Sequence, residues 1–268
     1  MRQVPLSRVA FAIVMIAVGL WGFAVSSFVA IWAPGIQPAG LRAPMAFACS
    51  LVSTAAGGGL LWRGSARLAS RVLLGLLLIW LIWCKGPPLI HAPTELASWE
   101  SLGETLVMVA AAWALAAGLD GNAPNDRTSG PLAQFGPRIL YGLALIAFGA
   151  AHFGYPALTA SLVPMWLPQH LAWVYLTGAA FVAAGLALVV GRLVRPAAVL
   201  SALQMLLFGV LVWLPRIAAG AHDADTLNEA GISFALAASG WVIATALTGR
   251  GALKTRLTST DIKNGGSS

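Results

Sequence analysis

Charged residues are scarce in this chain of 268 residues, because only 9% are Asp, Glu, Lys or Arg, against roughly a quarter in soluble domains. Two cysteines are too few for the disulfide framework of a small secreted module. Hydrophobic residues make up 59% and the mean hydropathy is +0.82, which excludes a disordered chain and an ordinary water-soluble fold. The composition therefore predicts an all-α polytopic membrane protein.

The motifs of familiar enzyme classes are also missing from the sequence. It contains no P-loop, no CxxCH haem-attachment site, no HExxH zinc motif, no GxSxG elbow and no Rossmann fingerprint. No predicted helix carries two histidines one turn apart, which argues against a haem or di-iron bundle. Whether the protein is an enzyme is left open by these motifs.

Eight stretches are long and apolar enough, or nearly so, to cross a bilayer core as helices of roughly 20 residues. They cover 9–32, 43–62, 70–90, 101–119, 139–154, 171–190, 196–214 and 229–248. The polar segment 120–137 is rich in turn-forming residues, and it separates a first four-helix repeat, 1–119, from a second, 138–248. We expect residues 249–268 to form a basic, flexible tail.

Residues of the first half recur in the second half at a nearly constant spacing. The pairs include Arg8 with Arg138, Gly19 with Gly149, Phe23 with Phe153, Pro34 with Pro164, Gly57 with Gly185, and Trp83 with Trp213. Apolar matches arise by chance, but paired Pro, Arg and Trp indicate a duplication. Each half has an even number of spans, so the two four-helix bundles are parallel repeats. By analogy with the second half, the first helix should end near Phe23, and residues 25–38 should lie at the interface or re-enter the membrane.

The distribution of charge predicts the orientation, because short cytoplasmic loops carry the Lys and Arg excess. With the N-terminus inside, every Lys and Arg lies on the inner side except Arg42, Lys85 and Arg216. We therefore predict a multi-pass protein of the bacterial inner (cytoplasmic) membrane with both termini in the cytoplasm. The isoelectric point near 10.3 then reflects contact with the lipid bilayer and its anionic headgroups, and not with nucleic acid.

All four histidines lie on the predicted outer side. His152 follows Arg138 by about 21 Å of helix at 1.5 Å per residue, so it lies near the outer end of its span among apolar neighbours. Ionisable residues inside a membrane are commonly functional, and the structural alternative is an imidazole bonded to a loop carbonyl. His91, His152 and His222 together are candidate metal ligands.

Two glutamates and two cations on this outer side are further candidates for ligand binding. Glu104 and Glu229 each open the fourth helix of their half, where a carboxylate either caps the helix or binds a ligand. Lys85 and Arg216 each follow a tryptophan near the interface. They either anchor the helix at the membrane surface or pair with the glutamate of their own half around an outer cavity.

The two cysteines, Cys49 and Cys84, lie at a similar depth in the outer halves of their helices. A disulfide between them would be compatible with an oxidising periplasm. Neither cysteine has a counterpart in the second half, and two separately buried thiols are the interpretation we favour.

The second half, about 110 residues long, carries a characteristic set of residues, namely Arg138, Gly-Ala-Ala-His-Phe at 149–153, Val-Pro-Met-Trp-Leu-Pro at 163–168, Tyr-Leu-Thr-Gly at 175–178, Gly-Leu-Ala-Leu at 185–188, Pro215-Arg216 and Glu229. With these residues it resembles the DoxX-like family of bacterial four-helix membrane proteins. The first half resembles a diverged copy, with Gly22 at the position of His152. The family pattern often has a glutamate where this chain has Phe181, so that acid is missing or relocated. The resemblance implies an association with redox processes, including thiosulfate:quinone oxidoreduction.

Three functional hypotheses follow. The first is a redox-associated subunit that binds quinone or a partner oxidoreductase near the outer face, with His152, Tyr155 and Trp166 around a cavity. The second is a small-molecule or ion transporter whose site lies at the interface of the repeats, although no acidic residue is expected near mid-membrane. The third is a non-catalytic scaffold or assembly factor. Whether the protein forms a homo-oligomer is open.

Overall fold

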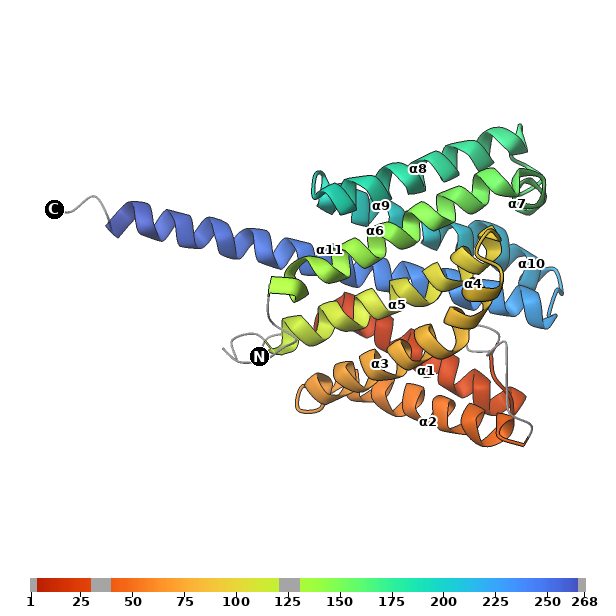
Figure 1. The fold of residues 1–268 in the computed structure, drawn as a ribbon, viewed down its shortest axis with the longest axis horizontal. Helices are drawn as coiled ribbons and strands as arrows, with labels where there is room; N and C mark the ends of the chain where they lie inside the picture. Colours follow the sequence, from red (N-terminus) through yellow and green to blue (C-terminus); the bar gives the residue numbers. More distant parts are fainter. Residues whose placement is uncertain (1–3, 30–39, 121–130, 265–268) are drawn as a thin grey trace.

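The computed structural model describes residues 4–29, 40–120 and 131–264, and these residues form helices and turns with no β-strand (Figure 1). Seven of the described helices are long and apolar enough to cross a membrane, and there are eight spans if the bent pair α6 and α7 is counted as one. The chain is therefore an all-helical, multi-pass membrane protein. This confirms the fold class expected from the composition.

The first half contains five α-helices and one π-helical turn. They are α1 (Leu6–Val25), α2 (Arg42–Leu61), α3 (Ala66–Trp80), the π-helical turn η2 (Leu81–Lys85), α4 (Gly86–His91) and α5 (Leu96–Asp120). Helix α1 ends where Ser26 turns left-handed, at φ 49°, and its N–H donates to the Phe23 carbonyl oxygen. This end agrees with the position expected from the repeat. Most of the expected interfacial segment, 30–38, lies outside the described residues.

The described elements of the second half follow the same order, with the short helix α7 after the first long one. Its elements are α6 (Pro131–Gly154), α7 (Pro156–Leu162), α8 (His170–Val190), α9 (Val194–Phe208), the π-helical turn η3 (Gly209–Trp213), α10 (Leu214–Ala218) and α11 (Ala224–Asn264). Helix α6 begins inside the segment expected to be a linker, with Pro131 in its first turn, where a missing N–H costs nothing. Helix α11 runs to Asn264, so most of the tail that we expected to be flexible is helical.

The two halves share the same crossing of their first two long helices, which is direct structural evidence for the repeat. In the first half, a β-carbon at Gly57 would lie 3.0 Å from the Ala12 carbonyl oxygen and 2.9 Å from a side-chain carbon of Ile16. In the second half, a β-carbon at Gly185 would lie 2.6 Å from the Gly142 carbonyl oxygen and 2.7 Å from Ile146. Glycine at these positions lets the helix backbones approach closely.

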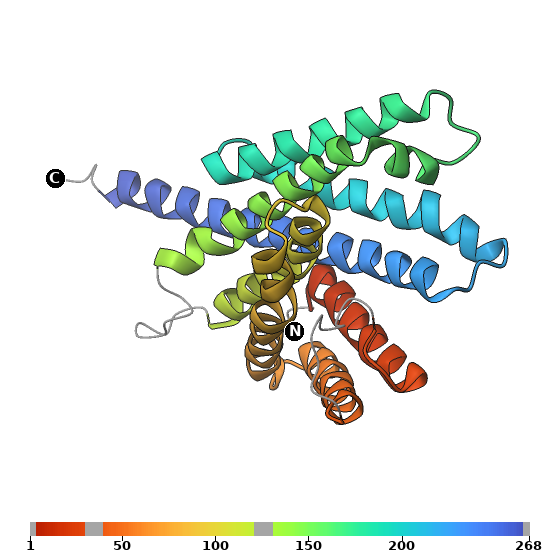
Figure 2. The same cartoon turned by 45° about the vertical axis from the view of Figure 1, so that its right-hand side comes forward.

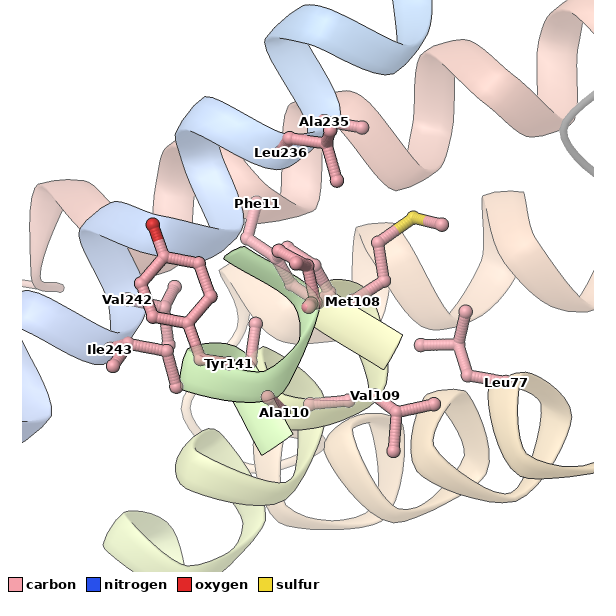
Figure 3. Close-up of a cluster of buried hydrophobic side chains, with 14 of the residues drawn as sticks. Phe11, Leu77, Met108, Val109, Ala110, Tyr141, Ala235, Leu236, Val242 and Ile243 are labelled. Carbon is pink, nitrogen blue, oxygen red and sulfur yellow. The ribbon is translucent and has the colours of Figure 1, made fainter. Parts of the chain in front are cut away.

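Helices α5 and α11, the last helix of each half, form the centre of the molecule. Each has 61% of its most apolar window buried, against 28–33% in the other single-helix spans. Figure 2 shows the helices of the two halves on either side of this central pair. Figure 3 shows the core between the halves, where Phe11 and Met108 of the first half meet Tyr141 and Ile243 of the second. The halves therefore share one continuous hydrophobic core.

Each half also has a π-helical turn followed by a proline-rich short helix. η2 precedes Pro87 and Pro88, and η3 precedes Pro215. The short helices α4, α7 and α10 lie at the end of the molecule opposite the two chain termini (Figure 1). We call it the α4–α7–α10 end, and the charge distribution predicts that it faces outward. Because π-helical turns are frequent at functional sites, this end is a candidate location for a functional site.

Candidate functional site

A cavity of about 790 Å³ lies between the two halves at the α4–α7–α10 end. We call it the seam cavity, because η2 and α5 of the first half line it together with α6, α8, α9, η3 and α11 of the second. Helix α7 and the loop 163–169 cover it. Most of its wall is apolar, with a group of polar residues from both halves on one side. A concave, mostly apolar space with few polar groups is typical of a small-molecule site.

His152 of α6 lies in the aromatic part of this wall. Its Nδ1 lies 2.8 Å from the carbonyl oxygen of Phe148, which can only accept, so Nδ1 donates and the neutral ring keeps its lone pair on Nε2. The imidazole stacks on Phe208, with ring centroids 6.0 Å apart, and meets the edge of Phe181 at 5.5 Å. His152 is only 8% exposed, yet it lines the cavity. The imidazole is thus bonded to a carbonyl, as in the structural alternative, although this carbonyl belongs to its own helix and not to a loop, and it also lines the cavity.

The histidine fits because the facing residue of α8 is a glycine. A β-carbon at Gly178 would lie 2.9 Å from the β-carbon of His152. In the first half the arrangement is reversed, since Gly22 takes the histidine position and its β-carbon would collide with the side chain of Ser50. The repeats therefore differ at this crossing, and the first half has no room for an equivalent imidazole.

Phe181 of α8 lies beside His152, with ring centroids 5.5 Å apart. It is 2% exposed and packs edge-on against Phe148 and Phe208, with ring centroids 5.9 Å apart in both pairs. The neighbour of the imidazole on α8 is therefore an aromatic ring and not a carboxylate. The acids of this site come from other helices.

Those acids form a polar cluster with Lys85 on the cavity wall. Lys85, the last residue of η2, is 7% exposed and its Nζ donates to Ser101 Oγ at 2.7 Å. Glu104 lies within electrostatic range of Lys85, Glu100 and Glu229. All five residues line the cavity. We call Lys85, Glu100, Ser101, Glu104 and Glu229 the seam cluster.

The two predicted glutamates do not cap their helices, contrary to one of the two expectations. Helix α5 begins at Leu96 and α11 at Ala224, so Glu104 and Glu229 lie one to two turns inside. The cap of α11 is Asp223, whose carboxylate accepts from the Thr226 N–H at 2.8 Å and the Thr226 hydroxyl at 2.7 Å. These hydrogen bonds to the charged form lower the pKa of Asp223. Because capping is done by Asp223 in α11, Glu229 is left to face the cavity.

The covering segment is held at both of its ends. The chain turns by 97° between α6 and α7, and at this bend the Tyr155 hydroxyl donates to Glu95 Oε2 at 3.3 Å. At the end of α7, Arg216 Nη2 donates to the Ser161 carbonyl oxygen at 3.1 Å. The Arg216 guanidinium also lies 5.3 Å from the centre of the Trp213 ring. We call Tyr155 to Leu167 the roof.

Neither cation is found in an ion pair with the glutamate of its own half, since Lys85 donates to Ser101 and acts on Glu104 only through its charge. Lys85 is close to Glu104, whereas Arg216 binds the roof and the ring of Trp213 and does not line the cavity. Trp166 lines the cavity from the roof, although 68% of its surface is exposed. Six of the seven candidate ligand-binding residues thus lie around one cavity, and the seventh holds its roof.

The metal hypothesis for His91, His152 and His222 is not supported by their positions. His91 ends α4 and His222 lies before α11, both exposed, while His152 is enclosed by aromatic rings. Among the residues that the structure describes, no three or more His, Cys, Asp or Glu are grouped so that they could hold a metal ion. The cysteines agree with the favoured interpretation, since both are free, with Cys84 buried and Cys49 partly buried.

Sequence reasoning missed several members of the site. Glu100 could have been found from its spacing, because it lies one helical turn before Glu104 and shares its face of α5. Gln204 of α9, whose Nε2 donates to the Thr177 carbonyl oxygen at 3.1 Å, gave no sequence signal. Its place on the cavity wall depends on how α8 and α9 pack.

Comparison with known proteins adds one partial match. A family model described as a domain of unknown function (DUF8561) matches residues 141–230. The matched segment runs from α6 into α11, so it includes His152, the roof and Glu229 but neither Lys85 nor Glu104. No curated protein and no solved structure matches the chain. The match covers the half of the chain in which we noted the DoxX-like residues.

Proposed function

We propose that the protein is a membrane carrier that binds a small amphipathic molecule in the seam cavity. The observation that carries this proposal is the placement of a buried lysine and three glutamates on a cavity wall built by both repeats. Ionisable groups inside a membrane are costly, and they usually mark a ligand or ion pathway. Carriers built from repeats bind their substrates where the repeats meet.

The position of Glu104 supports transport, which the sequence had disfavoured. Glu104 lies about 12 Å along α5 from its start at 1.5 Å per residue, so a carboxyl group lies inside the apolar helix and not at its end. A scaffold without a site is less compatible with this arrangement, because a scaffold has no need to hold such a cluster beside an open cavity of about 790 Å³. We place the carrier in the bacterial inner membrane with both termini in the cytoplasm, as the charge distribution predicts.

A redox-associated role is the second candidate, and a specific observation favours it. The Nε2 atom of His152 carries the lone pair of the neutral ring and can accept a hydrogen bond, as from the hydroxyl of a quinol, and the surrounding rings of Phe181 and Phe208 could stack on a flat headgroup. These features suit a quinone, which the DoxX-like resemblance implies. In this role the protein would pass its ligand to a partner oxidoreductase and would not move it across the membrane.

Binding to the seam cavity can be measured by tryptophan fluorescence, because Trp166, Trp173 and Trp213 line it. We would titrate the full chain in nanodiscs with two probes, tetraphenylphosphonium and a short-tailed ubiquinone. We expect saturable quenching by at least one probe in the wild type. Substituting Ala97→Phe, which narrows the cavity, should weaken binding at least tenfold, whereas the exposed Ala224→Phe should not.

Uptake of the bound probe into proteoliposomes, above that of protein-free vesicles, separates the two candidates. A carrier gives uptake that Ala97→Phe reduces. Binding without uptake supports the redox role, and the absence of saturable binding by either probe contradicts both candidates.

A further inference from the structure

The charge on the seam cluster specifies the class of molecule that the carrier takes. We infer that the seam cavity binds a bulky organic cation, such as an ammonium or phosphonium, which enters as the cluster releases a proton. This inference rests on the proposed function and names its substrate. It is carried by the charge balance of the cavity, by the separation of its carboxylates and by its aromatic wall.

The charge balance is the first argument. Glu100, Glu104 and Glu229 line the cavity, and among the described residues Lys85 is the single Lys or Arg that does so. Lys85 already donates to Ser101. With all four groups ionised the cavity has an excess of negative charge. In a space of low dielectric this excess attracts a cation and repels an anion.

The second argument is that the carboxylates are arranged for a large cation. They are close enough for their charges to interact, yet within the described residues they form no group that could chelate a metal ion. A small ion needs several oxygen ligands at about 2.0–2.6 Å. Carboxylates spread over α5 and α11 around about 790 Å³ instead fit a charge carried by a bulky molecule.

The aromatic wall is the third argument. Aromatic rings line the cavity from α6, the roof, α8, α9 and η3, and they include Phe148, Phe181, Phe208, Trp166, Trp173 and Trp213. The faces of such rings attract cations, and this attraction is strongest where water is excluded. The rings also bury apolar substituents, so cationic and apolar parts of one molecule are both accommodated.

Electroneutrality explains why a proton leaves. Three carboxylates beside one lysine leave an excess of two negative charges, which is unfavourable in a low-dielectric space, so the empty cluster holds protons on its carboxyl groups. An entering monovalent cation replaces the positive charge of one of these protons, and that proton passes to water. The other titratable groups facing the cluster are His152 of α6 and Tyr155 of the roof, while Asp225 of α11 acts on Glu229. In the described residues, the lining of α8 and α9 contributes no charged side chain.

The test uses tetraphenylphosphonium, whose charge does not titrate, and the full chain in nanodiscs. We expect its dissociation constant to fall at least tenfold between pH 6 and pH 8, because the cluster releases its proton more easily as the pH rises. Glu104→Gln should weaken binding at least tenfold and flatten this pH dependence. The matched control is Asp223→Asn, which removes a carboxylate outside the cavity and keeps a capping oxygen.

Lys85→Gln provides a readout with the opposite sign. Removing the positive charge of Lys85 should tighten tetraphenylphosphonium binding several-fold. A variant that failed to fold would instead bind the cation less tightly. Binding of the neutral short-tailed ubiquinone with no binding of the cation would overturn this inference and leave the cavity as a ligand site. Cation binding that is unchanged by pH and by Glu104→Gln would overturn it as well.

Discussion

A few glycines decide where the helices of each half can approach and where an imidazole can enter. Gly142 of α6 and Gly185 of α8 face each other. A β-carbon added to Gly142 would lie 2.8 Å from the Gly185 carbonyl oxygen, and one added to Gly185 would lie 2.6 Å from the Gly142 carbonyl oxygen. Gly178 leaves room for His152, whereas in the first half the side chain of Ser50 fills the space beside Gly22. The difference between the two halves at this crossing thus depends on which helix carries the glycine.

Gly185→Ala should destabilise the protein by about 1–3 kcal/mol, because its β-carbon would press on backbone atoms that cannot move aside. The measurement is thermal unfolding in detergent, followed by circular dichroism. Gly58→Ala is the matched control, since it lies within a helix but no atom lies within 4 Å of an added β-carbon. We expect Gly58→Ala to be neutral or stabilising by about 0.5–1 kcal/mol. Equal losses of stability would contradict the close approach of α6 and α8.

At the scale of elements, short segments rather than the long helices shape the site. The π-helical turn η2 places Lys85 in the cavity wall, and the 97° bend at Tyr155 turns α7 across its top. The roof is then fixed by Tyr155 to Glu95 and by Arg216 to Ser161. Both bonds are exposed, so each is weak enough to open. A roof held in this way can close over a ligand without trapping it.

Arg216→Gln should release the end of α7 and make the cavity more accessible. The reporter is Thr159→Cys, a lining residue of the roof, in a background where Cys49 and Cys84 are replaced by serine. We expect maleimide labelling at position 159 to be several-fold faster with Arg216→Gln. Arg42→Gln, an exposed arginine at the start of α2, is the control and should leave the rate unchanged. An unaltered rate in Arg216→Gln would show that the roof is held by other contacts.

At the scale of the molecule, the two repeats are joined through α5 and α11. Their buried faces form the shared core, and the parts of these helices that follow the first turn carry Glu100, Glu104 and Glu229 to the same cavity. A site assembled from both halves responds to any change in their relative position. This arrangement suits a carrier better than a site contained in one half.

The orientation of the whole molecule is predicted by its basic residues and can be tested by fusion reporters. If this end lies in the cytoplasm, as the charge distribution predicts, green fluorescent protein joined after Ser268 should be fluorescent. Alkaline phosphatase joined at the same place should then be inactive. Alkaline phosphatase inserted in the loop before α11, next to His222, should be active. The reverse pattern would place the seam cavity on the cytoplasmic side.

The class of protein and the approximate number of spans could be predicted from the sequence, and the repeat was a prediction of the same kind. Apolar runs, clustered basic residues and paired Pro, Arg and Trp are local properties, and they depend only on the composition of each segment. Most of the candidate ligand-binding residues could be named for the same reason, since polar side chains inside apolar runs are conspicuous.

Which of these residues share one site is visible in the tertiary structure alone. It brought Lys85 and Glu104 to Glu229 across the two halves, placed Arg216 on the roof, and kept His91 and His222 away from His152. It also shows that α5 and α11 begin before the apolar runs predicted for them. Glu104 and Glu229 therefore lie on a cavity wall and not at helix caps. The physical reason is that a site depends on distances between helices, and these are set by close packing at residues such as Gly142 and Gly185.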